Sequence, residues 1–255
     1  MKKNAICFLS LAMMLASCST HYQVSGVSRS RILVDKTFDK TVDADAEAFI
    51  APYKHKVDSI MSPVVGHAAE YMFAERPESN LSNLLCDILV WAGKNYNEKP
   101  EFSVYNMGGI RAALSEGTVT YGDVLDVSPF ENKICFFDLK GSDVKKLFEQ
   151  IARNRGEGVS KEVKLVITKD GKLVSVKING EDIDENRTYR VVSIDYLAQG
   201  NDGLTALKNK TNLNSPQEKK NNIRFVIMDY FREQEAQGKA VSAKVEGRVE
   251  VKSEK

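Results

Sequence analysis

Apolar residues recur at intervals of three and four along several stretches of the chain, which is the spacing of an amphipathic helix. The most regular stretch is SNLSNLLCDILVWAGKN, where Ser79 is the expected N-cap and Gly93 lies near the C-terminal end. Thr120 and Ser142 are the expected N-caps of two further helices. Pro52 weakens the first part of the earliest pattern. The expected helices cover residues 43–60, 79–95, 120–127, 141–156 and 221–234.

Runs rich in β-branched and aromatic residues predict strands between these helices. In EVKLVITKDGKLVSVKING, the central Asp-Gly pair predicts a turn that joins two strands. The other expected strands cover residues 64–73, 101–105, 133–139, 188–197 and 244–251. Strands and helices mix without regular βαβ alternation, so the α+β class is favoured. We expect a single mixed-sheet domain over residues 43–251.

Composition limits the partners of this domain. With 255 residues, 42% hydrophobic and 28% charged, the chain can bury one substantial core. Lys and Arg total 36 against 35 for Asp and Glu, which gives a net charge of +1. No bulk field therefore attracts a nucleic acid polymer or an anionic membrane, and any anion must be recognised locally.

The N-terminus has the pattern of a secretory signal. Two lysines precede a short apolar run that polar sequence quickly follows, so the run is too short to span a bilayer. The run closes in LASC, which resembles the lipobox of bacterial lipoproteins and implies cleavage before Cys18 and acylation of its thiol. The alternative is an ordinary signal peptide with an incidental cysteine.

The lipobox predicts how this end of the chain is organised. Residues 1–17 form the expected signal peptide, and residues 18–42 the expected lipidated N-terminus and flexible tether. The protein would then be anchored to a membrane of the bacterial cell envelope without spanning it. No acidic run follows Cys18, which favours a periplasm-facing anchor over surface display.

Two cysteines remain for the folded body. Cys86 lies in the apolar helix pattern NLLCDILVWAG and Cys135 in the strand-like KICFFDL. An oxidising periplasm would allow them to pair. Their apolar neighbours favour two buried free thiols, and the sequence leaves both states open.

Common catalytic motifs are missing from the sequence. The histidines at positions 21, 55 and 67 belong to no HExxH, DxH or paired-His pattern, which argues against a transition-metal or dimetal site built by this chain. The sequence also has no GxSxG elbow, Walker loop or GxGxxG. The sequence leaves a Ser-His-Asp triad open, but nothing points to one. We expect no catalytic residue and no cofactor in this chain.

What remains is a set of turns that could receive a ligand. In NMGGIR, Gly108 and Gly109 permit close approach and positive φ, and Asn106 can donate and accept hydrogen bonds. Arg111 is a permanent planar cation suited to bidentate contacts with an anion. The alternative is a tight connecting turn with an exposed arginine.

Two later turns carry aromatic residues. In VSPFENK, Pro129 fixes the approach and Phe130 lies on a bend, where it could stack on a ligand or pack in the core. In YLAQGNDGL, Tyr196 offers a flat face, and Asp202 is a carboxylate able to accept hydrogen bonds from two vicinal hydroxyls.

In their order along the chain, these motifs resemble the C-terminal domain of the 5'-nucleotidase family. NxGGIR is followed by SPFENK and, much later, by YRVVSIDYLAQGNDG. ERPESNLSNLLCDIL before the first turn and DLKGSDVKKLFE between the second and third extend the resemblance from about residue 43 to residue 251.

The resemblance implies a nucleotide site. Phe130 and Tyr196 would clamp a base, and Asp202 would hold ribose hydroxyls. Asn106, Gly108, Gly109 and Arg111 would face the polar edge and the phosphate. Arg76 is the nearest match to a phosphate-contacting arginine of the family.

Some positions depart from the family pattern. Tyr196 replaces a usual phenylalanine, which preserves a stacking surface. Asn201 replaces a glycine of GGDG, which is expected to strain or reshape the ribose loop. Ser82 replaces the glycine of NLGNL.

The larger departure concerns a whole domain. Family members carry an N-terminal metallophosphatase domain that binds two metals, and these 255 residues hold neither its motifs nor room for it. The favoured hypothesis is that this chain binds nucleotide and completes a separate metallophosphatase subunit, which supplies the divalent metals, in nucleotide catabolism. The alternative is a non-catalytic lipoprotein that binds nucleotides or nucleosides.

Overall fold

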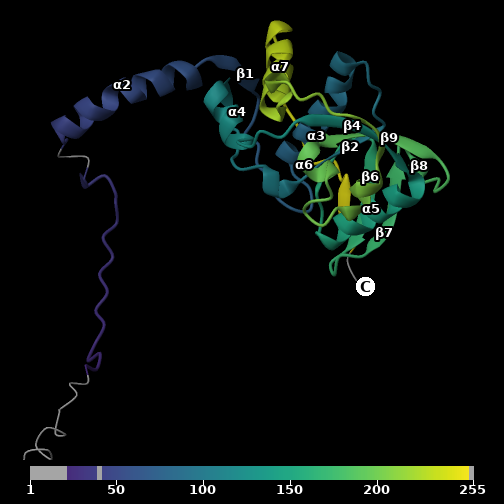
Figure 1. The fold of residues 1–255 in the computed structure, drawn as a ribbon, viewed down its shortest axis with the longest axis horizontal. Helices are drawn as coiled ribbons and strands as arrows, with labels where there is room; N and C mark the ends of the chain where they lie inside the picture. Colours follow the sequence, from purple (N-terminus) through teal and green to yellow (C-terminus); the bar gives the residue numbers. More distant parts are fainter. Residues whose placement is uncertain (1–21, 39–41, 253–255) are drawn as a thin grey trace, which may run out of the picture. The chain divides into compact units, whose positions relative to one another are not determined.

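The computed structural model of the protein describes residues 22–38 and 42–252 (Figure 1). The expected signal peptide and Cys18 lie outside the described residues. The chain divides into two units after Ile50. Among residues 22–38 and 42–252, no helix combines the length and the apolar character needed to cross a bilayer.

The first helix, α2, spans Ala44–Met61 and contains Pro52, in agreement with the helix expected over residues 43–60. Asp43 caps it, because its Oδ1 accepts hydrogen bonds from main-chain N–H groups of the first turn at 3.1 and 3.0 Å. None of the residues of α2 is buried. Its apolar positions are therefore not part of the core.

A five-stranded mixed sheet lies at the centre of the second unit, in the order β10-β4-β9-β2-β5. Strand β9 pairs in parallel with β2 and antiparallel with β4, in a register that runs from Ile134 opposite Ile194 to Lys140 opposite Thr188. The strands are β2 (Phe102–Tyr105), β4 (Ile134–Lys140), β5 (Gly158–Val159), β9 (Thr188–Ile194) and β10 (Thr211–Asn214). The mixed pairing confirms the α+β class.

The other named strands of the described residues form two smaller sheets. One has the order β11-β6-β7-β8, and the other pairs β1 with β3. The turn predicted at Asp170-Gly171 joins β6 to β7, and Gly171 has a φ of 82°. The strands are β1 (Val64–Ala68), β3 (Gly117–Thr120), β6 (Val163–Thr168), β7 (Leu173–Ile178), β8 (Glu181–Asp182) and β11 (Val249–Lys252).

The strand expected over residues 64–73 is too long. Strand β1 ends at Ala68, because the N–H of the next residue, Ala69, donates to the carbonyl of Val241 and the chain leaves β3. Met72 forms only an isolated bridge with Leu114. A local apolar pattern does not reveal this change of partner.

Helices cover the sheets. Helix α3 packs on β2, β5 and α7, and α5 contacts β4 and β9 as well as β6 and β7. Helix α7, yellow in Figure 1, lies against β1 and α4. These helices are α3 (Asn80–Ala92), α4 (Tyr121–Val127), α5 (Gly141–Arg153), α6 (Asp195–Ala198) and α7 (Ile223–Ala236). The short 3-10 helices are η2 (Gly93–Tyr96), η3 (Met107–Gly109), η4 (Thr205–Asn209) and η5 (Lys219–Asn221).

Capping follows the sequence in two helices and not in a third. Ser79 caps α3 and Thr120 caps α4, each in a capping box. The expected cap Ser142 is wrong, since α5 begins at Gly141 with Lys140 as an N-cap that makes no side-chain bond. The N–H groups of Gly141 and Ser142 donate instead to the carbonyls of Arg187 and Glu185. Distant backbone thus replaces the side-chain cap.

Both cysteines of the folded body are free and buried. Burial raises the pKa of Cys135 to about 12, and it also raises the pKa of Cys86. Of the two states left open by the sequence, the structure has the free thiols. Both are protonated at neutral pH and serve as small apolar core residues.

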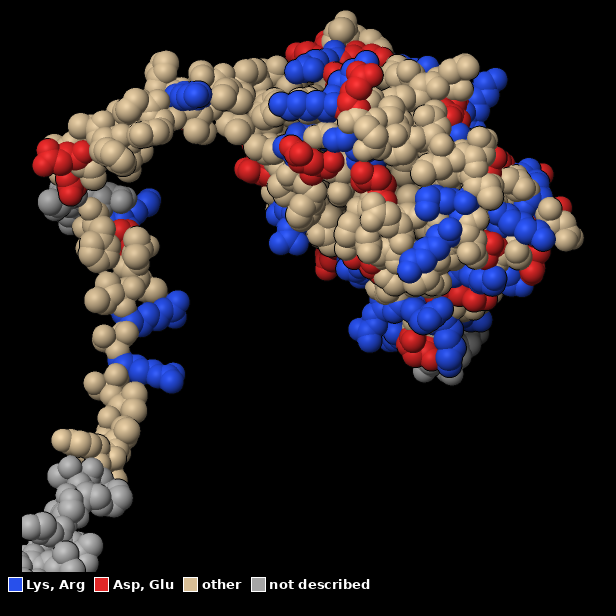
Figure 2. Space-filling model, in the orientation of Figure 1, with Lys and Arg blue, Asp and Glu red and all other residues tan. Residues whose placement is uncertain are grey.

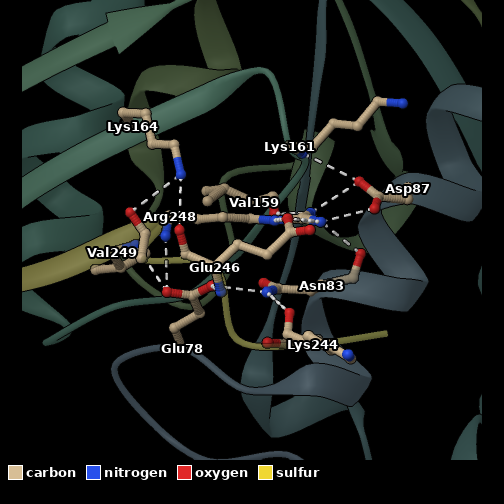
Figure 3. Close-up of polar contacts among 12 residues, drawn as sticks. Glu78, Asn83, Asp87, Val159, Lys161, Lys164, Lys244, Glu246, Arg248 and Val249 are labelled. Atoms are coloured by element: carbon tan, nitrogen blue, oxygen red, sulfur yellow. Dashed lines mark hydrogen bonds and ion pairs between the residues drawn. The ribbon is translucent and has the colours of Figure 1, made fainter. Parts of the chain in front are cut away.

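The C-terminal segment is held against α3 by a polar cluster (Figure 3). Buried Arg248 donates to the two carboxylate oxygens of Asp87 at 2.8 and 2.7 Å. Glu78 accepts hydrogen bonds from the main-chain N–H groups of Arg248 and Val249 at 2.7 and 3.2 Å. These contacts tie the start of β11, which pairs in parallel with β6, to α3 and to the residue that precedes its N-cap. Over the face shown in Figure 2, acidic and basic side chains of the folded body are interspersed.

Candidate functional site

The first predicted turn follows the buried strand β2 and is held by a tight backbone. Within η3, the N–H of Gly109 donates to the carbonyl of Asn106 at 3.0 Å. A Cβ on Gly109 would lie 2.6 Å from Asn106 Oδ1, whereas a Cβ on Gly108 would meet nothing within 4 Å. Neither glycine has a positive φ. Close approach therefore explains Gly109, and neither residue uses the positive φ that glycine permits.

The third predicted turn has a left-handed backbone at three positions. Gly200, Asp202 and Gly203 have φ values of 84°, 53° and 76°. Asn201 does not have a positive φ, and its Nδ2 donates to the carbonyl of Tyr196 at 2.8 Å. Of the two effects expected of Asn201, strain or a reshaped loop, the structure shows no strained φ at this residue, and its side chain closes the turn. Asn154 Nδ2 also donates to the carbonyl of Asp202, at 2.9 Å.

The Asp202 carboxylate joins the first and third turns. Its Oδ2 accepts a hydrogen bond from Asn106 Nδ2 at 2.6 Å, and its Oδ1 accepts one from the Tyr196 hydroxyl at 2.7 Å. The bond to Asp202 is the largest cause that raises the pKa of Tyr196 above its usual value. The phenol is therefore protonated and donates this bond at neutral pH.

Phe130 is presented by the second turn, and this turn is tied to the third. Asp195 Oδ1 accepts hydrogen bonds from the N–H groups of Lys133 at 3.1 Å and Tyr196 at 2.8 Å. Phe130 is 46% exposed and Tyr196 37% exposed. The two aromatic residues are thus surface residues on linked segments, and neither is core packing.

The three turns enclose one cavity of about 230 Å³. It is lined by Asn106, Gly108, Gly109, Phe130, Asn132, Tyr196 and Asp202. All the residues expected to bind a ligand line it, apart from the two arginines. Asn132 was missed by the sequence analysis, although it lies two residues after Phe130 in the quoted motif.

The two arginines lie outside this lining. Arg111 Nη1 donates to the carbonyl of Gly108 at 3.2 Å, which places an exposed guanidinium beside a residue of the lining. Arg76 Nη2 donates to Glu157 Oε1 at 2.5 Å, and the other oxygen of Glu157 accepts from the N–H of Met107 at 2.7 Å. Arg76 thus reaches the first turn through a carboxylate.

Glu157 is a site residue that sequence reasoning missed. Its side chain is 1% exposed. Burial raises the pKa of Glu157, while the N–H of Met107 and the Arg76 guanidinium act in the opposite direction. No local pattern marks this residue, because its role depends on partners from distant segments.

A second hollow, of about 570 Å³, lies between α5 and β7. Charged side chains line it, and Lys145 and Glu185 among them form an ion pair. None of the residues of the three turns contributes to it. We therefore place the candidate site in the smaller cavity. Within residues 22–38 and 42–252, no group of three or more His, Cys, Asp or Glu residues could hold a metal ion.

Comparison with known proteins agrees with this location. A model of the family described as 5'-nucleotidase, C-terminal domain, matches residues 64–209. The chain belongs to this family. All three turns of the cavity lie inside the matched residues.

Relatives of the C-terminal domain are longer than this chain. Protein UshA of Yersinia enterocolitica is 33% identical over 151 residues, which are 58% of this chain and 26% of that protein. Protein UshA of Escherichia coli is 28% identical over 166 residues, or 64% of this chain and 30% of that protein. The chain therefore spans less than a third of the length of these two relatives.

Solved structures of relatives have the same fold. The 5'-nucleotidase precursor of Thermus thermophilus matches with a TM-score of 0.70 and 30% identity, over 83% of this chain and 44% of that one. The NAD nucleotidase of Haemophilus influenzae matches with a TM-score of 0.62 and 21% identity, over 84% of this chain and 42% of that one, and shows the fold alone.

Proposed function

We propose that this chain is the nucleotide-binding component of a 5'-nucleotidase-type phosphohydrolase, and that it completes the active site of a separate metallophosphatase chain in nucleotide catabolism. The observation that carries the proposal is that Phe130, Tyr196 and Asp202 line the same cavity. Two exposed aromatic faces suit a base, and a carboxylate suits the hydroxyls of a ribose.

The cavity is small for a whole nucleotide, which supports the proposal that this chain forms only part of the active site. At about 230 Å³ it is smaller than the roughly 300–1,000 Å³ typical of pockets for drug-sized ligands. A base with part of its sugar fits this space better than a whole nucleotide. The phosphate would then extend past the rim, where Arg111 beside Gly108 offers a planar cation. Arg76 would keep the first turn in place through Glu157 and leave its exposed edge for the phosphate.

The missing part of the reaction is assigned to the partner. This chain supplies binding and orientation, and the divalent metals of the partner would activate water and stabilise the charge on the phosphoryl group.

The test measures phosphate release from several nucleotides with Mn²⁺, Zn²⁺ or Mg²⁺. The chain alone, a metallophosphatase encoded beside it, and a mixture of the two are compared. We expect this chain alone to stay well below about 1 s⁻¹, and the mixture to exceed the sum of its parts. Chelator-sensitive turnover by the chain alone would contradict the proposal.

The same test separates the alternative function. Calorimetric titration of adenosine and AMP into the chain alone shows whether it binds these ligands. If both bind and no mixture is faster than the phosphatase alone, the chain is a non-catalytic nucleotide-binding protein. Arg111→Lys is expected to weaken AMP and not adenosine, because the bidentate fork is lost.

Localisation is a further part of the proposal. The residues LASC support acylation at Cys18 and a periplasm-facing lipid anchor. Cys18→Ser should release the protein from the membrane fraction and leave its thermal unfolding unchanged. Unaltered membrane fractionation of this variant would contradict the anchor.

A further inference from the structure

The Tyr196 hydroxyl and Asn106 occupy both oxygens of the carboxylate that the proposed function assigns to ribose. Asn106 Nδ2 reaches Oδ2 of Asp202 at 2.6 Å, and the hydroxyl reaches Oδ1 at 2.7 Å. A vicinal diol would also bring two donors to one carboxylate. The protein's own donors thus stand where the sugar hydroxyls would bind.

The position of the hydroxyl is fixed by its own loop. Asn201 Nδ2 holds the carbonyl of Tyr196, and the positive φ of Gly200 and Asp202 turns the chain back toward the ring within six residues. Because Asp202 is exposed, its carboxylate is accessible to a ligand. The contact therefore lies at the surface that a sugar must reach.

The other donor, Asn106, has a side-chain oxygen that makes no hydrogen bond to the described residues. Asn106 is 5% exposed, and its Oδ1 has no hydrogen-bond partner among the described residues. Its Nδ2 is used by Asp202. A buried acceptor without a partner disfavours this arrangement. We therefore expect the hydrogen bonds among Asn106, Asp202 and Tyr196 to rearrange when a ligand brings new donors.

We propose that the Tyr196 hydroxyl competes with the ribose of a bound nucleoside for Asp202, so that this one side chain acts both for and against binding. Its ring supports the base, and its hydroxyl lowers the preference of the cavity for a ligand with a vicinal diol. This inference rests on the proposed function and adds a specificity-determining role for the phenol oxygen. A phenylalanine at this position would keep the ring and lack the competing hydroxyl.

The test compares adenosine with 2',3'-dideoxyadenosine by calorimetric titration into the full chain and into Tyr196→Phe. We expect the variant to bind adenosine about three- to tenfold more tightly, the effect of a typical net hydrogen bond. It should bind the dideoxynucleoside within about twofold of wild type, because that ligand lacks the 2'- and 3'-hydroxyls that would replace the phenol. Weaker or unchanged adenosine binding by Tyr196→Phe would overturn the proposal.

Two further variants sharpen the test. Tyr71→Phe removes a hydroxyl from an exposed tyrosine outside the cavity lining and should leave both affinities unchanged. In an Asp202→Asn background, Tyr196→Phe should change the ratio of the two affinities by much less, since the shared carboxylate is gone. An undiminished effect in that background would overturn the assignment to Asp202.

Failure of the inference and failure of the proposed function give different results. If wild type and Tyr196→Phe both bind adenosine and the affinity ratios are equal, only the competition is wrong. If neither protein binds either nucleoside, the cavity is not a nucleoside site and both proposals are overturned.

Discussion

Arg224 donates a hydrogen bond to the carbonyl of Pro129 at 2.7 Å across 95 positions of the chain. Arg224 is 9% exposed, and its Nε has no hydrogen-bond partner in the described part of the chain. Pro129 lies two residues after the last residue of α4, near helix carbonyls that favour a cation, and directly precedes Phe130. The C-terminal helix therefore supports the segment that carries one of the two rings, although Arg224 lies beyond the residues matched by the family.

Arg224→Ala should lower both stability and affinity. The carbonyl of Pro129 loses its donor, so we expect a loss of about 1–3 kcal/mol in the free energy of unfolding and weaker AMP binding. Chemical denaturation and calorimetry measure the two effects. Arg232→Ala is the matched control on α7, since this arginine is exposed and pairs with exposed Asp229, and it should cost less than about 1 kcal/mol. Equal stability and affinity in the two variants would contradict this role.

The rings themselves should account for much of the affinity. Phe130→Ala should weaken adenosine and AMP binding by about 1–3 kcal/mol, the range of base stacking on aromatic side chains. Tyr196→Ala should weaken it by less, because this change also removes the hydroxyl that competes for Asp202. Phe73→Ala is a suitable control, because Phe73 is also exposed and is not part of the cavity lining. If both ring variants bind like this control, under conditions where wild-type binding is measurable, the aromatic clamp does not exist.

The two adjacent glycines should respond differently to alanine. Gly109→Ala would place a methyl group 2.6 Å from Asn106 Oδ1, so it should destabilise the fold by roughly 1–3 kcal/mol. Gly108→Ala meets no protein atom within 4 Å and lines the cavity, so it should unfold like wild type and bind AMP more weakly. Thermal unfolding and titration of both variants separate the two roles. The reverse order of stabilities would show that the first turn is described wrongly.

Glu157 should make stability depend on pH in a defined direction. Burial raises its pKa above 4.5, so the native state binds this proton more tightly than the unfolded state does. The contribution of the protonated Glu157 side chain to the free energy of unfolding is fully present below about pH 4.5. It is lost as the pH rises through the raised pKa of the native state.

Denaturation of wild type and Glu157→Gln between about pH 4 and pH 8 tests this sign. The stability of wild type relative to the variant should fall as the pH rises over the lower part of this range. Glu149→Gln, at an exposed position on α5, controls for the general effect of losing a carboxylate. A difference that grows with pH would mean that the contacts with Arg76 and Met107 outweigh burial.

The sequence by itself determined the local elements and most of the cavity lining. Periodicity and capping residues located α3 and α4, and the Asp-Gly pair located the hairpin between β6 and β7. Glycines, an aromatic residue and a carboxylate marked the three turns. The sequence predicts these features because helix caps and tight turns depend on residues a few positions apart.

The tertiary structure alone decided how the turns meet. Asn106 and Asp202 are 96 positions apart, and the supports provided by Glu157, Asp195 and Arg224 join segments that the sequence does not relate. The same holds for the start of α5, where distant carbonyls replace the expected side-chain cap. Hydrogen bonds of this kind depend on which strands pair and which helices cover them. A local sequence pattern does not predict that arrangement. The contact between the Tyr196 hydroxyl and Asp202 likewise follows from how the loop folds back, since the sequence alone showed only an aromatic ring and a carboxylate.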